Sequence, residues 1–107
     1  DIAVDISDVY AQKIHALDAH VSQVYEWLPW IGGFLSEVPK DVAKREQWLA
    51  ATRAVKITPE MRSSLEKWYG KAHAAQVKHA ETFEICEYGT QPSEADIRRM
   101  FPMLVVK

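Results

Sequence analysis

The sequence is poor in the residues and patterns from which many functional sites are built. It contains one cysteine, Cys86, which excludes an internal disulfide and a zinc site made of several cysteines. It contains no apolar run of the 18 or so residues that a transmembrane helix needs, and nothing that resembles a signal peptide. We therefore expect no membrane partner and a reducing, cytoplasmic location.

Several catalytic motifs are also missing. There is no glycine-rich phosphate loop and no G-x-S-x-G nucleophile motif. Two metal-binding histidines on one helical face would be three or four residues apart, and no pair in this sequence has that spacing. The sequence therefore predicts no metal site or cofactor within this chain. The four histidines are His15, His20, His73 and His79.

The composition is that of a globular protein. The chain has 107 residues, of which 48% are hydrophobic, enough for one small domain. Its net charge of −2 gives no overall attraction to nucleic acid. The basic residues between positions 40 and 78 are interrupted by acids such as Asp41 and Glu60, so they form no basic stripe. We expect no nucleic-acid partner.

Apolar spacing predicts the first two elements. Residues 2–6 form a short apolar run with the character of a buried strand. Ser7 or Asp8 can cap a following helix, and residues 9–28 carry apolar side chains at spacings of three and four. Pro29 should end this helix.

Further along the chain, we expect a second helix over residues 41–53 and a third from Thr58 to Lys78, weakened only modestly by Gly70. A second strand near residues 82–88 has alternating apolar positions. A short helix should follow Ser93 and end before Pro102, and the apolar tail 103–106 should pack on the core.

The predicted fold class is mainly α, an α+β fragment with three to four helices and two short strands near residues 2–6 and 82–88. Two strands alone make a poor sheet. The chain also begins inside a strand without a methionine. We therefore expect that residues 1–107 form a single domain or fragment, the C-terminal part of a Rossmann-like α/β parent, with sequence missing upstream.

The predicted helix 9–28 carries polar residues beside its apolar stripe. At about 100° per residue, Lys13, His20 and Gln23 fall along one edge of that stripe. Three interpretations remain open: a hydrogen-bonded interior cluster, a polar strip that faces a ligand or catalytic pocket built by another segment, or simple exposure to solvent.

Aromatic residues are dense where this helix should end. Trp27 and Trp30 lie among other apolar side chains and just before Gly32. They could line a sugar- or lipid-binding pocket, or pack against another part of the parent, which is the interpretation we favour.

The stretch from Asp5 to Trp27 resembles the C-terminal segment of the PIG-L/LmbE-like deacetylase family. The shared pattern is a strand that ends in aspartate, followed by a helix with K-x-x-A-L-x-x-H-x-S-Q. The later stretch AETFEICEYG, with Glu81 and Phe83, is similar to the closing strand of the family. The matching helix residues are Lys13, Ala16, Leu17, His20, Ser22 and Gln23.

The resemblance implies a parent enzyme that uses zinc to remove acetyl groups from N-acetylglucosamine-type sugars or related substrates. The metal-binding loops and the general-base aspartate of the family are absent from these 107 residues, so no catalytic residue and no metal ligand is assigned here. The resemblance implies only a position beside the substrate pocket for the matching polar residues of the helix, which are Lys13, His20, Ser22 and Gln23.

Two functions are therefore expected. The first is the C-terminal portion of an N-deacetylase, inactive alone, whose partner is the missing N-terminal part and whose parent binds zinc. The alternative is a non-enzymatic helical module for protein interaction or homo-oligomerisation through exposed apolar surface.

Overall fold

The structure is a computed structural model that describes residues 2–104, and the chain divides into two compact units. Unit 1 combines the N-terminal residues up to Ser7 with the residues from Val55 onward. Unit 2 is the intervening segment Asp8–Ala54. Each unit has a hydrophobic cluster of its own.

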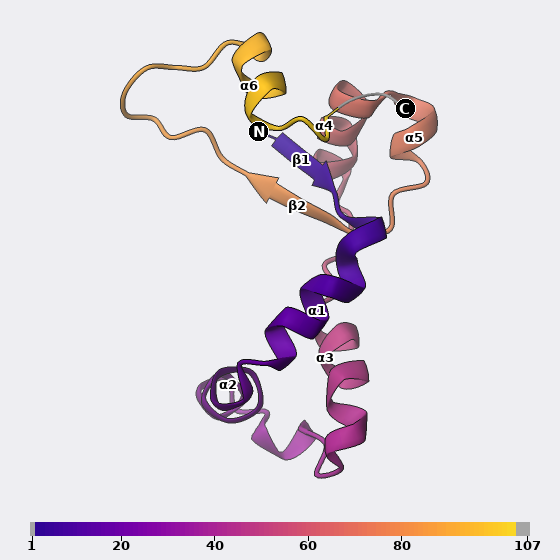
Figure 1. Ribbon diagram of the computed structural model, residues 1–107, viewed down its shortest axis with the longest axis vertical. Coiled ribbons are helices and arrows are strands. Elements are labelled where there is room, and N and C mark those ends of the chain that lie inside the picture. The colour runs from indigo at the N-terminus through magenta and orange to yellow at the C-terminus, as the bar shows by residue number, and fades with distance from the viewer. Residues whose placement is uncertain (1, 105–107) are drawn as a thin grey trace. The chain divides into compact units, whose positions relative to one another are not determined.

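Unit 1 is built on a two-stranded antiparallel sheet (Figure 1). Strand β1, Ile2–Asp5, pairs with β2, Ala80–Phe83, so that Ile2 lies opposite Phe83. Three consecutive residues of β1 are buried, which means that both faces of this strand are covered.

Three helices complete unit 1. Helix α4, Pro59–Tyr69, packs against β1, and the single turn α5, Lys71–Ala74, follows it directly. Helix α6, Glu94–Met100, supplies Ile97 to the same core. The fully buried members of this core include Ala3, Leu65, Trp68 and Ala74.

Unit 2 is entirely helical. Helix α1, Tyr10–Asp18, follows a 3₁₀ turn at Ser7–Val9. A wide π-helical turn, Gln23–Trp27, leads into α2, Leu28–Gly32. Two further 3₁₀ turns, Leu35–Glu37 and Val42–Lys44, precede α3, Arg45–Arg53, which packs beside α1 (Figure 1). The small core of this unit consists of Ile14, Val24, Tyr25 and Leu49.

The mainly helical α+β prediction is confirmed, although the described residues form six α-helices rather than three or four. The predicted elements 2–6 and 41–53 are close to the observed ones. Among residues 2–104, no helix combines the length and apolar character that crossing a bilayer would require.

The prediction of one helix over residues 9–28 is wrong. Helix α1 ends at Asp18, and the chain turns at Ala19 and His20 before helical structure resumes. Leu17 packs against the core of this unit, but no residue from Asp18 to Gln23 is fully buried, so little buried apolar surface favours an unbroken α-helix across this stretch. Pro29 does not end the helical region but lies in the first turn of α2, where a missing N–H costs little.

The predicted helix 58–78 is also interrupted. Gly70 has φ 81° and ψ 159°, a conformation essentially restricted to glycine, and α4 therefore ends at Tyr69. The second strand spans residues 80–83 rather than 82–88, because β1 begins opposite Phe83 and offers no described partner further along. Of the predicted tail contact, Leu104 is buried and Met103 is half exposed, while positions 105–106 lie outside the described residues.

Candidate functional site

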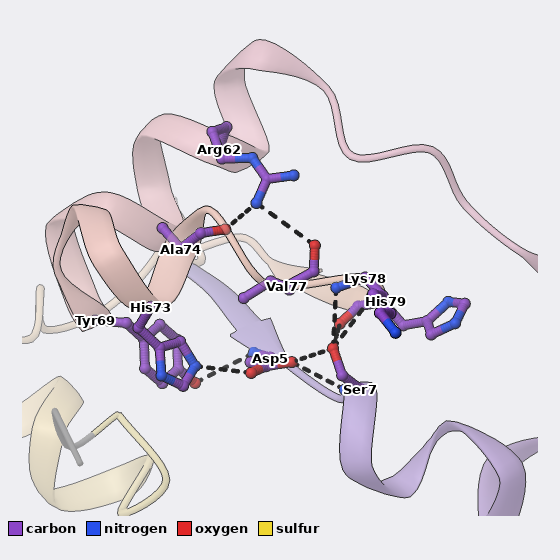
Figure 2. Close-up of polar contacts among 9 residues, drawn as sticks. All are labelled: Asp5, Ser7, Arg62, Tyr69, His73, Ala74, Val77, Lys78 and His79. Carbon is purple, nitrogen blue, oxygen red and sulfur yellow. Dashed lines mark hydrogen bonds and ion pairs between the residues drawn. The ribbon is translucent and has the colours of Figure 1, made fainter.

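The polar centre of unit 1 is Asp5, the last residue of β1 (Figure 2). One carboxylate oxygen, Oδ2, lies 2.8 Å from Nε2 of His73. The other, Oδ1, accepts hydrogen bonds from the Ser7 amide at 2.9 Å and from the Ser7 hydroxyl at 2.6 Å. Both carboxylate oxygens are thus engaged by groups of the same unit.

The local sequence explains half of this arrangement. An aspartate readily accepts a hydrogen bond from the amide two residues later, and Ser7 occupies that position relative to Asp5. The Ser7 oxygen in turn accepts the amides of Lys78 and His79, at 3.1 and 3.3 Å. The turn after β1 is therefore tied to the segment that leads into β2.

The other half comes from the end of α4. The ring of Tyr69 stacks on the imidazole of His73, with centroids 4.8 Å apart and planes 13° from parallel. The Tyr69 hydroxyl accepts the Asp5 amide at 3.2 Å. Gly70 makes this possible, because its positive φ redirects the chain between Tyr69 and α5.

Arg62 holds the far end of α5. Its guanidinium donates to the carbonyl oxygen of Ala74 and, at 3.5 Å, to that of Val77 (Figure 2). Carbonyls at the end of a helix lack intrahelical partners, and a basic side chain can satisfy them. His73 is therefore carried on a turn that is anchored at both ends.

The electrostatics favour a charged Asp5 and a neutral Tyr69. Burial alone would raise the pKa of Asp5, but hydrogen bonds from Ser7 and the neighbouring His73 outweigh it and hold that pKa below its usual value. Burial raises the pKa of Tyr69; the Asp5 amide opposes this rise, and the Asp5 charge adds to it. The Asp5 carboxylate is therefore an acceptor at neutral pH.

Ser7, Asp5 and His73 are the residue types of a nucleophilic triad, but their hydrogen bonds connect them differently. In a triad the serine hydroxyl contacts the histidine, which removes its proton, and the aspartate orients the histidine. Here the Ser7 hydroxyl donates to the carboxylate of Asp5, and its oxygen accepts two backbone amides. This arrangement does not activate Ser7 as a nucleophile. It joins the end of β1 to α5 and to the segment that leads into β2.

The sequence-predicted pocket residues all lie in unit 2. Lys13 is half-buried on α1, whereas His20, Ser22 and Gln23 are exposed and follow the end of that helix. The turn at Ala19 and His20 means that one helical wheel does not describe all four positions. Their role beside a substrate pocket stays a prediction.

The described residues do not fit a zinc ion. Within residues 2–104, no three histidine, cysteine, aspartate or glutamate side chains lie close enough to hold a metal. Asp5 and His73 form a pair only.

The aromatic cluster at the end of the first helical region divides into buried and exposed members. Tyr25 is buried, and its hydroxyl donates to Asp18 Oδ1 at 2.5 Å. Trp27, Trp30 and Ile31 are 49%, 68% and 58% exposed. Since residues three and four apart are neighbours on a helix, these three form a continuous apolar surface.

Sequence reasoning missed the pairing of Asp5 with His73. The spacing Asp-x-Ser is a local signal that the carboxylate is held by its own turn. The histidine comes from a helix 68 residues away, and no local pattern identifies it. Searches of protein-family models, of curated proteins and of solved structures found no match to this chain.

Proposed function

We propose that this chain is the C-terminal portion of a Rossmann-like, zinc-dependent N-deacetylase that acts on an N-acetylated sugar or a related substrate in the cytoplasm. In this proposal the chain supplies supporting structure and part of the pocket wall. The zinc and the catalytic groups belong to the remainder of the protein, and the chain alone is inactive.

The observation that supports the proposal most is the engagement of Asp5. The resemblance to the deacetylase family is most specific in the stretch that begins at this aspartate, where a strand ends and a helix follows. In the structure, Asp5 is held by Ser7 and His73 and fixes the end of β1. An aspartate with this task accounts for the residue at that position without giving it a catalytic role.

Three of the four proposed wall residues have exposed side chains. His20, Ser22 and Gln23 are exposed on unit 2, so each can contact another part of a larger protein. Lys13 precedes them on α1. We propose that these four residues border the pocket.

Metal analysis of the purified 107-residue chain tests whether the zinc ligands lie outside this chain. After incubation with zinc and removal of the excess, the chain should retain far less than a stoichiometric amount. Retention of stoichiometric zinc against a mild chelator would contradict the proposal, because a bound ion would require a ligand set within this chain. The His73→Gln variant serves as a control for weak binding by the histidine of the Asp5 pair.

The surface made by Trp27, Trp30 and Ile31 favours a second candidate, a helical module for protein interaction or homo-oligomerisation. Exposed apolar surface of this kind commonly marks a contact site. Sedimentation over a range of concentrations should then show self-association that weakens in Trp30→Ser but not in Val42→Ser, which removes a side chain that is 71% exposed and is not part of this surface. A concentration-independent monomer would dismiss homo-oligomerisation.

A further inference from the structure

The outer edge of β1 is covered by side chains of α4. Residues along an antiparallel strand alternate between those that hydrogen-bond to the neighbouring strand and those that face away from it. The Ile6 amide donates to the His79 carbonyl on the β2 side. By this alternation, the amides of Ala3 and Asp5 face away from β2 and toward the open edge.

Both outward amides have side-chain acceptors. The Ala3 amide donates to Ser64 Oγ at 2.9 Å, and the Asp5 amide donates to the Tyr69 hydroxyl at 3.2 Å. Both acceptors lie on α4, which packs along β1. Two hydroxyl groups thus stand where the carbonyls of a third strand would be.

The geometry of the two elements accounts for this match. Two residues of strand advance by about 6.8 Å, which separates the outward amides of Ala3 and Asp5. Five residues of helix advance by about 7.5 Å, which separates Ser64 from Tyr69 along the axis of α4. The two side chains leave α4 about 140° apart around its axis, so the short Ser64 and the longer Tyr69 side chain reach the two donors from different directions.

We infer that Ser64 and Tyr69 form an edge guard, which prevents a further strand, including that of a second copy of this chain, from pairing with β1. An exposed edge is a template for strand addition, because its unpaired amides and carbonyls accept another chain. With these donors occupied, the sheet can grow only at the outer edge of β2. The inference holds whether or not the chain belongs to a deacetylase.

Backbone hydrogen exchange tests the guard in the double variant Ser64→Ala/Tyr69→Phe, which removes two hydroxyl groups and keeps the Tyr69 ring. The amides of Ala3 and Asp5 should exchange about tenfold faster than in the unaltered chain, since each loses a hydrogen bond, while those of Val4 and Ile6 keep their rates. The same variant should show a higher average mass by sedimentation at high concentration. The control is Ser63→Ala/Tyr88→Phe, which removes two exposed hydroxyls.

Unchanged exchange at Ala3 and Asp5, or an average mass equal to that of the control, would overturn the inference. If the double variant does not fold, Ser64→Ala alone decides the matter. Faster exchange confined to Ala3 would then support the guard, and exchange equal to that of Ser63→Ala would refute it.

Discussion

His73 fixes the end of strand β1 from 68 residues away: its Nε2 lies 2.8 Å from Oδ2 of Asp5. The contact joins the first strand of unit 1 to the turn α5, and the Ser7 hydroxyl ties the same carboxylate to the segment before β2. Asp5 is thus the residue on which the polar connections of this unit converge.

Replacement of Asp5 should destabilise unit 1. In Asp5→Asn the charge-assisted hydrogen bonds to His73 and Ser7 are weakened, and we expect the free energy of unfolding to fall by about 2 kcal/mol. Urea denaturation measures the change. Asp8→Asn, at an exposed position, is the matched control and should have little effect. A loss no larger than that of the control would show that the Asp5 network adds nothing to stability.

The stability of the chain should depend on pH through Asp5. Its pKa in the folded chain is lower than its usual value, so its contribution is present at neutral pH and is lost as the pH falls below about 4, through the folded-state pKa. Asp96, whose pKa is lowered by hydrogen bonds from Ser93, acts in the same pH range. The informative quantity is therefore the difference in free energy of unfolding between the unaltered chain and Asp5→Asn, measured by urea denaturation from pH 7 to pH 2. That difference should shrink on acidification, and a difference that stays constant would contradict the assignment.

The break between α4 and α5 depends on glycine. Gly70→Ala should lower the free energy of unfolding by about 1–3 kcal/mol, because φ 81° with ψ 159° is a region almost closed to residues with a Cβ atom. Gly33→Ala is the comparison: Gly33, with φ 74° and ψ 16°, is in the left-handed helical region, which other residues enter more easily. Neither added Cβ would meet an atom within 4 Å, so the comparison isolates the backbone. Thermal or urea unfolding should rank Gly70→Ala as the more damaging, and the reverse order would refute this account.

Unit 2 should be sensitive to the hydroxyl of Tyr25. Tyr25→Phe removes the 2.5 Å hydrogen bond to Asp18 from a ring that also lies under the Arg45 guanidinium. We expect a loss of about 1–2 kcal/mol in unfolding free energy, against almost none for Tyr88→Phe at an exposed position. Burial, together with the Asp18 hydrogen bond and charge, also raises the pKa of Tyr25 above the ordinary tyrosine value. An ultraviolet titration in which every tyrosine ionises near its ordinary pKa while the chain stays folded would contradict that contact.

The sequence predicts those elements that carry strong local signals. Thr58 caps α4 with Pro59 in its first turn, and Ser93 and Asp96 form a reciprocal capping box at α6. Such caps use only neighbouring residues, so the pattern alone identifies them.

The errors arise where distant contacts or backbone geometry decide. The apolar spacing continues past His20, but helix α1 ends at Asp18. No residue from Asp18 to Gln23 is fully buried, so burial does not favour a continuous helix there. Gly70 counts as a mild weakness on a propensity scale, whereas its φ of 81° ends the helix. The candidate site depends on the contact between His73 and Asp5. These residues are 68 positions apart, so the path of the chain through unit 1, and no local pattern, brings them together.

The proposal that this chain belongs to a zinc-dependent N-deacetylase is tested most directly on the product of the complete gene that encodes it. That protein should contain zinc in stoichiometric amount, release acetate from an N-acetylglucosamine derivative, and lose this activity on chelation and regain it with zinc. A pure, folded product that contains no zinc and releases no acetate from a panel of N-acetylated sugars would contradict the proposal.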